Sequence, residues 1–406
     1  MAVDPRQVLG AFLTLSMFAM LSNMVKRDYF DSSEVGFQGV SSVQFGVIRV
    51  EDKGVDDLPS ASKGPWRERD PELKPCWTKP SPLPAKSKGY ITFSLTNGPG
   101  HHEFLGAALV LPEIRGRELG QQRAFGDVYD VGKLRSSLDG VVEVIEELPG
   151  EVAVEHPAVV RIPDGVTEGY ISSNVEPIFR KKGHLRLAVF FPPGKKNLRA
   201  GSRPREELDS LRCLARFGAL ELSPEMQEVA VSMVDRLRAP GQKTDGHFVA
   251  VDLRLEVLDG KSCKEEAVRG RRSCYSPQEV GEFLTRAGFD AGTTVYLTQT
   301  WWHESLDALK GMFPRTLTKD DIIPPEKKRQ ILSSGGDDLG KVLDLYICSQ
   351  SDVFLPAVPD LPFHGSVVGR RIAAGRTQIL SPSSSPPEFI SAAVSGGGHE
   401  ALSCYC

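Results

Sequence analysis

From residue 89 onward, the chain alternates short apolar runs with longer amphipathic segments. Apolar runs of about four to eight residues bounded by polar turns are typical of buried strands. The runs that predict strands are YITFSL (90–95), AALVL (107–111), AVVRIP (158–163), HLRLAVFF (184–191), HFVAVDLRLE (247–256), TTVYLTQ (293–299), DVFLPA (352–357) and TQIL (377–380). Strands that alternate with helices favour an α/β fold with parallel sheets.

Helical periodicity separates several of these strands. The predicted helices are residues 223–241, 276–290, 303–313 and 338–348. Ser223 caps the first of them, and Ser276 with Glu279 forms a capping box at the start of the second. Gly288 then follows the end of the second helix, as a C-terminal cap does.

These segments form two successive βα blocks, residues 89–242 and 243–406. They predict two doubly wound, Rossmann-like domains that face one another. In such folds, ligands bind outside the carboxyl ends of the strands.

The link between the first two predicted strands is unusually short. Asn97-Gly98-Pro99-Gly100 follows the first strand, and only residues 97–105 lie before the second. Two parallel neighbouring strands need a crossover of about a dozen residues or more, usually a helix. Either these strands are not parallel neighbours, or a crossover segment is missing.

The amino terminus carries an uncharged run, residues 8–25, between Arg6 and Lys26-Arg27. A run of this length suits a membrane-spanning helix and exceeds a typical signal-peptide core. We therefore expect residues 1–27 to be a cytosolic tail with an uncleaved signal anchor, in preference to a cleaved signal or a core helix. Residues 28–88, rich in Gly, Ser, Pro and charge, are predicted to be a stem.

The net charge bears on the possible partners of the chain, and the cysteine content bears on its cellular compartment. The net charge of −4 gives no electrostatic footprint for nucleic acid, so none is expected as a partner. Seven cysteines fit an oxidising lumen, where Cys263 and Cys274 would close a basic loop. Cys348 sits in an apolar stretch and is predicted to be a free core thiol.

Familiar catalytic motifs are absent from the sequence, including the phosphate-binding loop, the dinucleotide fingerprint, the nucleophile elbow and the zinc-protease motif. His101-His102-Glu103 hints at a metal, but adjacent ligands on a loop are weak evidence, and no metal site is predicted. Trp301-Trp302 follows a predicted strand, where core packing and a sugar-stacking platform are the alternatives.

Arg254 is the leading candidate for chemistry. It lies near the carboxyl end of a central strand, where a guanidinium pointing into the interdomain cleft would grip a diphosphate in bidentate fashion. The alternative is a structural pair with a neighbouring carboxylate. Ser351-Asp352 opens a later strand, and Arg370, Arg371 and Arg376 lie around the start of the next helix and strand, an arrangement that suits an anion.

Six segments carry a resemblance to a known family across about 300 residues. They are YITFSLTNGPG, GAALVLPEIRG, FVAVDLRLEVL, CYSPQEVGEFLTRAGFDAGTTVYLTQ, LKGMFPRTLTK and SDVFLPA, in this order. Together they resemble the plant protein O-fucosyltransferase-like family, in its mannan-synthesis-related branch. The resemblance implies a single-pass type II Golgi membrane protein with a GT-B glycosyltransferase fold, in which the second domain, residues 243–406, binds the nucleotide-sugar. It also implies an inverting, metal-independent transferase with GDP-fucose as donor, no cofactor, and a protein or polysaccharide acceptor.

The resemblance also assigns residues. Arg254 matches the arginine of the family's His-Leu-Arg motif, which holds the donor diphosphate, and is the predicted catalytic residue. The predicted donor-binding residues are Asn97, Gly98 and Gly100 of the glycine loop, Asp252, Ser351, Asp352 and Arg371.

Two departures from the family pattern bear on activity. Asp252 stands where the motif has histidine, and a carboxylate repels a diphosphate unless it is turned away or paired. The family's helix between the glycine loop and the next strand is shortened here, as a mis-called exon boundary would produce. The catalytic hypothesis therefore stands beside two others, a non-catalytic Golgi partner of a mannan synthase and a lumenal carbohydrate binder.

Overall fold

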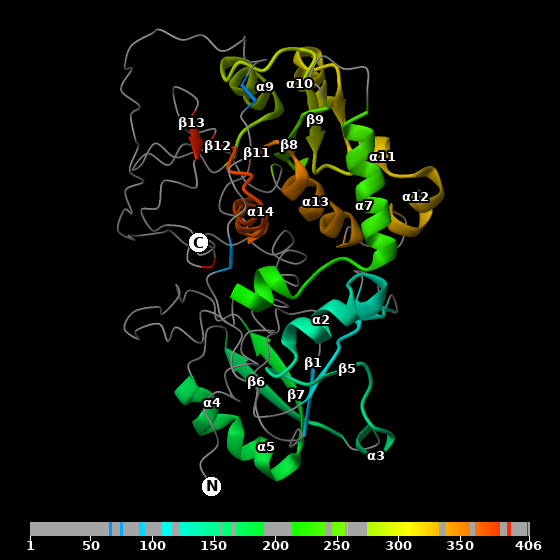
Figure 1. Cartoon of the computed structure of the whole chain (residues 1–406), viewed down its shortest axis with the longest axis vertical. Coiled ribbons are helices and arrows are strands. Elements are labelled where there is room, and N and C mark those ends of the chain that lie inside the picture. The colour runs from blue at the N-terminus through cyan, green and yellow to red at the C-terminus, as the bar shows by residue number, and fades with distance from the viewer. Residues whose placement is uncertain are drawn as a thin grey trace. The chain divides into compact units, whose positions relative to one another are not determined.

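The computed structural model describes most of both predicted domains. The described residues are 65–66, 74–75, 89–93, 108–115, 122–153, 156–163, 168–190, 213–239, 246–255, 258, 274–332, 338–357, 362–381, 388–390 and 404. The described residues from 89 to 227 form one compact unit, and those at 65–75 and from 228 onward form a second. Each unit contains its own parallel sheet (Figure 1).

The first unit is built on five parallel strands in the order β5-β2-β1-β7-β6. They are β1 (Tyr90–Phe93), β2 (Ala108–Val110), β5 (Val144–Ile145), β6 (Ala158–Pro163) and β7 (His184–Phe190). The other elements are a small ribbon of β3 (Ile114–Arg115) and β4 (Gln122–Arg123), η1 (Phe125–Asp127), α2 (Val131–Leu138), α3 (Gly150–Ala153), α4 (Glu168–Asn174), α5 (Glu176–Lys182) and the π-helical turn η2 (Leu214–Gly218).

The pairing of β1 with β2 decides between the two explanations of the short connection. The strands are parallel neighbours, with Tyr90 opposite Ala108 and Ile91 opposite Leu109. The explanation that they are not neighbours is therefore wrong. A missing crossover segment remains the prediction, and the connecting residues, 94–107, lie outside the described part of the chain.

The second unit is built on six strands in the order β10-β9-β8-β11-β12-β13, of which only β13 is antiparallel to its neighbour. They are β8 (Phe248–Asp252), β9 (Thr294–Leu297), β10 (Thr316–Leu317), β11 (Val353–Pro356), β12 (Ile379–Ser381) and β13 (Glu388–Ile390). The chain runs outward from β8 through β9 to β10 and then crosses to β11. The order therefore reverses between β8 and β11, which is where doubly wound sheets bind ligands.

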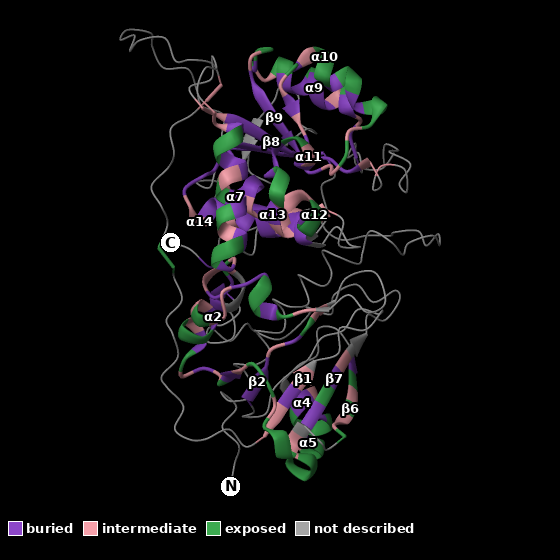
Figure 2. Cartoon of the chain, turned by 90° about the vertical axis from the view of Figure 1, so that its right-hand side faces the viewer, coloured by how far each residue is buried: buried purple, intermediate pink, exposed green. Residues whose placement is uncertain are grey.

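Helices surround this second sheet. They are α7 (Pro224–Leu237), whose residues from Glu228 belong to this unit, α9 (Pro277–Arg286), η3 (Glu304–Leu306), α10 (Asp307–Met312), α11 (Lys319–Ile322), α12 (Pro325–Leu332), α13 (Asp338–Gln350) and α14 (Pro362–Ala373). Every residue of β8, β9 and β11 is buried, as expected for parallel strands covered on both faces (Figure 2).

Local sequence signals account for α9. The Ser276 hydroxyl and the Glu279 carboxylate form the predicted capping box. Gly288, after the end of the helix, has a φ of 93°, which lies in the region that favours glycine. The buried face of the helix, including Val280 and Phe283, packs into the core around β8 and β9.

A short piece of the predicted stem packs on the second unit. The Trp66 ring stacks on His247 at 5.2 Å between centroids and meets Phe289 edge-on at 5.0 Å. Trp66 also packs against the buried apolar cluster of this unit. Trp66, within the predicted stem, therefore packs on the second unit.

The described cysteines are of two kinds. Cys348 is free and buried, as predicted, and its burial raises the pKa of the thiol well above the usual value. Cys213, Cys274 and Cys404 each take part in a disulfide. Cys263, the predicted partner of Cys274, lies outside the described residues.

Candidate functional site

The point where the strand order reverses in the second sheet carries the leading candidate residue. β8 ends at Asp252, directly opposite Pro356 at the end of β11. Arg254 follows β8 by two residues and therefore lies at the carboxyl edge of the sheet. The structure places it in the region of this fold where ligands bind.

The guanidinium of Arg254 is held from two sides. Its Nε lies 3.3 Å from Oδ1 of Asp252, and the side chain is only 4% exposed. Its Cζ lies 5.4 Å from the centroid of the Phe363 ring, in the first turn of α14. The Arg254 side chain is therefore held between the Asp252 carboxylate and the Phe363 ring at the start of this helix.

Asp252 is fully buried beside Arg254. Its Oδ1 accepts a hydrogen bond of 3.0 Å from the Thr298 hydroxyl, while Oδ2 has no hydrogen-bond partner among the described residues. The carboxylate is therefore paired with a cation, which is the condition under which it would not repel a neighbouring diphosphate.

Sequence reasoning missed a buried polar cluster that supports this edge. The Lys319 ammonium, which is fully buried, donates to the Thr298 carbonyl and, at 2.7 Å, to Oδ2 of Asp344. The Tyr296 hydroxyl donates to Oδ1 of Asp344 at 2.6 Å. The signal in the sequence was Asp344 itself, an acidic residue within an otherwise apolar stretch, VLDLYIC (342–348).

Thr298 connects this cluster to the candidate site. Its hydroxyl accepts a hydrogen bond of 3.1 Å from the Leu253 amide, while also donating to Asp252. Its carbonyl accepts from Lys319. The backbone between Asp252 and Arg254 is therefore tied to the residue that follows β9, and that residue is tied in turn to α11.

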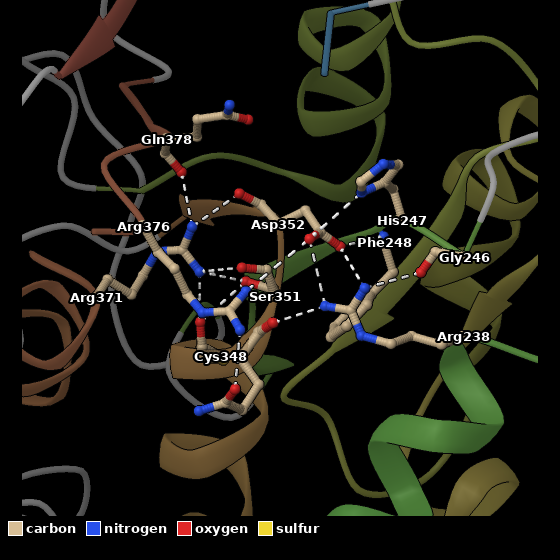
Figure 3. A network of polar contacts seen from close by, with 11 residues as sticks. Arg238, Gly246, His247, Phe248, Cys348, Ser351, Asp352, Arg371, Arg376 and Gln378 are labelled. Atoms are coloured by element: carbon tan, nitrogen blue, oxygen red, sulfur yellow. Dashed lines mark hydrogen bonds and ion pairs between the residues drawn. The ribbon is translucent and has the colours of Figure 1, made fainter. Parts of the chain in front are cut away.

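Ser351, Asp352 and Arg371 lie together in a second polar network (Figure 3). Nη1 of Arg371 is within hydrogen-bond distance of the Cys348 carbonyl (2.9 Å) and of the Ser351 carbonyl and hydroxyl (2.6 and 2.7 Å). Nη2 donates to the carbonyls of Asp352 (2.9 Å) and Gln378 (3.1 Å). One fully buried guanidinium thus joins the end of α13 to the starts of β11 and β12.

The Asp352 carboxylate joins the same network to the start of β8. Its Oδ2 accepts from the Phe248 amide at 3.0 Å and forms an ion pair of 3.0 Å with Arg238. Its Oδ1 lies 3.4 Å from Nδ1 of His247 and 3.9 Å from Nη1 of Arg376. Three basic side chains therefore surround this carboxylate, as Figure 3 shows.

One expectation about these arginines is wrong. Arg370 and Arg371 lie in the last turn of α14 and not near its start. The helix begins earlier, at Pro362, since proline is favoured at the first position of a helix. Cations in a last turn complement the negative end of the helix dipole, so these arginines do not form an anion site at a helix amino terminus.

The candidate residues thus form two groups. Asp252 and Arg254 share the carboxyl edge of the second sheet, while Ser351, Asp352 and Arg371 share its amino edge. The two edges are separated by the length of β8, about 13 Å between its end residues. Donor binding by the second group stays a prediction, and Asn97, Gly98 and Gly100 lie outside the described residues.

Metal-ligand groupings do not occur among the described residues, where no three His, Cys, Asp or Glu side chains gather. His101-His102-Glu103 lies outside that part of the chain.

Trp301 and Trp302 differ in their contacts and in their exposure to solvent. Trp302 donates from Nε1 to Asp307 at 3.0 Å and lies under the Lys310 ammonium, whereas Trp301 is 54% exposed.

Comparison with known proteins gives consistent sequence matches. Residues 100–371 match the model of the family described as GDP-fucose protein O-fucosyltransferase. The chain is 44% identical to Protein MANNAN SYNTHESIS-RELATED 2 of Arabidopsis thaliana and 39% identical to Protein MANNAN SYNTHESIS-RELATED of Trigonella foenum-graecum, each alignment covering all of both proteins. These alignments extend over 427 and 426 positions, more than the 406 residues of this chain. The relatives therefore contain residues without a counterpart here.

Solved structures give weaker matches. POFUT1 in complex with GDP is 14% identical with a TM-score of 0.41, covering 71% of this chain and 95% of that chain. NodZ alpha-1,6-fucosyltransferase soaked with GDP-fucose is 13% identical with a TM-score of 0.37, covering 70% and 89%. Both likenesses are distant, and the family is shown by the sequence matches.

Proposed function

Because the chain belongs to the GDP-fucose protein O-fucosyltransferase family, we propose that it is a glycosyltransferase that takes a sugar, fucose in the first instance, from a GDP-sugar. The observation that carries the proposal is the position of Arg254, a cation held at the carboxyl edge where the order of the second sheet reverses. That edge is where a doubly wound domain binds a nucleotide.

Arg254 would stabilise the leaving diphosphate. A guanidinium presents parallel N–H donors that match two phosphate oxygens, and its charge offsets the negative charge that develops as the sugar departs. A cation in this role makes a metal unnecessary, so we propose a metal-independent transfer. We also propose inversion at the anomeric carbon, as the resemblance to the family implies. The catalytic base is not assigned, since Asp252 is buried and paired and Glu256 lies outside the described residues.

The names of the relatives suggest the process in which the chain acts. Two full-length relatives carry names that describe them as related to mannan synthesis, and we propose that this chain also acts in cell-wall mannan synthesis. We further propose a Golgi membrane location through the apolar run at 8–25. That run lies outside the described residues, within which no helix is long and apolar enough to cross a membrane.

The second candidate function is a non-catalytic partner of a mannan synthase with the same fold. The observation that favours it is the ion pair of Arg254 with Asp252. A donor diphosphate has to compete with this internal carboxylate for the guanidinium, which weakens donor binding relative to an unpaired arginine. A partner protein of this kind would need no turnover.

Donor binding by the full-length chain tests the proposal. We expect GDP and GDP-fucose to bind in a calorimetric titration and Arg254→Ala to weaken binding at least about a hundredfold, because a charge-assisted bidentate contact is lost from a buried site. Arg254→Lys, which keeps the charge without the planar fork, should fall between the two.

Arg286→Ala is the matched control, because this exposed arginine of α9 lies in the same unit. It should bind GDP as the wild type does. Thermal melting of every variant separates lost binding from lost folding. A wild-type chain that melts cooperatively and binds neither nucleotide would rule out the transferase proposal and favour the partner role.

A further inference from the structure

Trp301 is the aromatic residue among the exposed large apolar side chains of the described part of the chain. We propose that its indole is a stacking platform for a saccharide acceptor beside Arg254. The inference rests on the proposed transferase function and deepens it, because it selects a polysaccharide in preference to a protein as the acceptor class.

Exposure at this position is unusual. Among the described residues, the large apolar side chains that remain exposed are Val159, Ile178, Val231 and Trp301, and Trp301 is the one aromatic residue among them. Tryptophan is highly buried on average because its large apolar surface gains most from leaving water. An indole more than half exposed therefore retains apolar surface that a ligand can cover.

The loop that carries Trp301 is held on both sides. The Gln299 and Thr300 carbonyls each accept a backbone hydrogen bond of 3.2 Å from the start of α11. On the other side, Trp302 is held by Asp307 and by the Lys310 ammonium, which lies 4.2 Å from its ring centroid. Fixed neighbours limit the ordering cost of binding, because the backbone around the platform is already in place.

This loop also lies next to the candidate donor site. It follows β9 at the carboxyl edge, and Oε1 of Gln299 accepts a hydrogen bond of 3.0 Å from the Leu255 amide. Leu255 directly follows Arg254 in the chain. Trp301 is two residues from Gln299, which holds the backbone next to Arg254. This position suits the binding of an acceptor, because the acceptor must meet the donor sugar near Arg254.

The surroundings of Trp301 favour a sugar over a protein surface. The residues that follow Trp302 are polar and exposed, namely His303, Glu304 and Ser305. A protein interface needs a contiguous apolar patch at its centre, which one indole with polar neighbours does not supply. A hexose ring presents an apolar C–H face and a rim of hydroxyls, so it matches an aromatic face bordered by hydrogen-bonding groups.

Binding of manno-oligosaccharides to the full-length chain tests the platform. We expect the wild type to bind them and Trp301→Ala to weaken binding about fivefold or more, because the stacking contact is lost. Trp301→Phe keeps an aromatic face and should retain most of the affinity. Val231→Ala, which truncates another exposed apolar side chain, is the matched control and should bind as the wild type does.

Titration of GDP into the same proteins separates this inference from the transferase proposal. Trp301→Ala should leave GDP affinity unchanged, so saccharide binding without GDP binding would defeat the transferase proposal and leave the platform standing. A wild-type chain that binds no manno-oligosaccharide overturns the platform. Equal saccharide binding by the wild type and Trp301→Ala also overturns it and points to another surface, or to a protein contact for Trp301.

Discussion

The ion pair between Asp252 and Arg254 is the residue-scale feature that sets the chemistry of the site. Both side chains are buried, so the pair lies in a medium where charge interactions are strong and an unpaired charge is costly. The carboxylate therefore has two opposed effects. It stabilises the folded chain by neutralising Arg254, and it competes with a diphosphate for the same guanidinium.

Asp252→Asn should separate these two effects. We expect the variant to bind GDP about tenfold more tightly, because the competing charge is gone. It should also unfold more easily, by about 2–5 kcal/mol, because Arg254 is left buried without its counter-ion. Calorimetry with GDP and urea denaturation measure the two quantities on the same protein.

An exposed carboxylate gives the control for this pair. Asp290→Asn, at a turn in the same unit, should change neither quantity. If Asp252→Asn binds GDP more weakly than the wild type, the carboxylate is part of the binding surface and not a competitor, and the account of the pair is wrong.

At the scale of elements, the predicted stem contributes Trp66 to the second unit. The stacked contact with His247 and the edge-on contact with Phe289 join Trp66 to residues that lie just before β8 and just after α9. The second unit therefore includes a residue that precedes all of the described strands and helices in the sequence.

Trp66→Ala should destabilise this unit by about 1–3 kcal/mol, less than the loss of a fully buried tryptophan, since the ring is only partly buried. Urea denaturation followed by circular dichroism measures the change, and Trp66→Phe, which keeps a ring, should recover part of it. An unchanged midpoint for Trp66→Ala would mean that the stem contact contributes nothing to stability.

Elements with strong local signals could be predicted from the sequence, and contacts between distant residues could not. The capping box fixed the start of α9, and the apolar run at 158–163 coincides with β6. By contrast, the start of α14 was placed too late, near Arg370, because Pro362 was not recognised as the first position of a helix. The burial of Arg371 depends on carbonyls at the ends of α13, β11 and β12, which no local pattern reveals.

At the scale of the whole molecule, the candidate site was predicted in part. The position of Arg254 at a strand end follows from its own sequence neighbours, and the structure confirms that it lies there. Ser351, Asp352 and Arg371 meet at the opposite edge because of the order of the strands in the sheet. This order could not be predicted from the composition of the chain. Lys319 was missed because a buried lysine is recognised only through partners in other elements, here Asp344 and the Thr298 carbonyl.

The most direct test of the transferase proposal is turnover of GDP-fucose by the purified full-length chain in the presence of mannan. We predict release of GDP together with transfer of labelled fucose to the acceptor, and loss of both in Arg254→Ala. A wild-type chain that binds GDP-fucose and releases no GDP, with or without acceptor, would contradict the catalytic account and identify the protein as a non-catalytic member of the family.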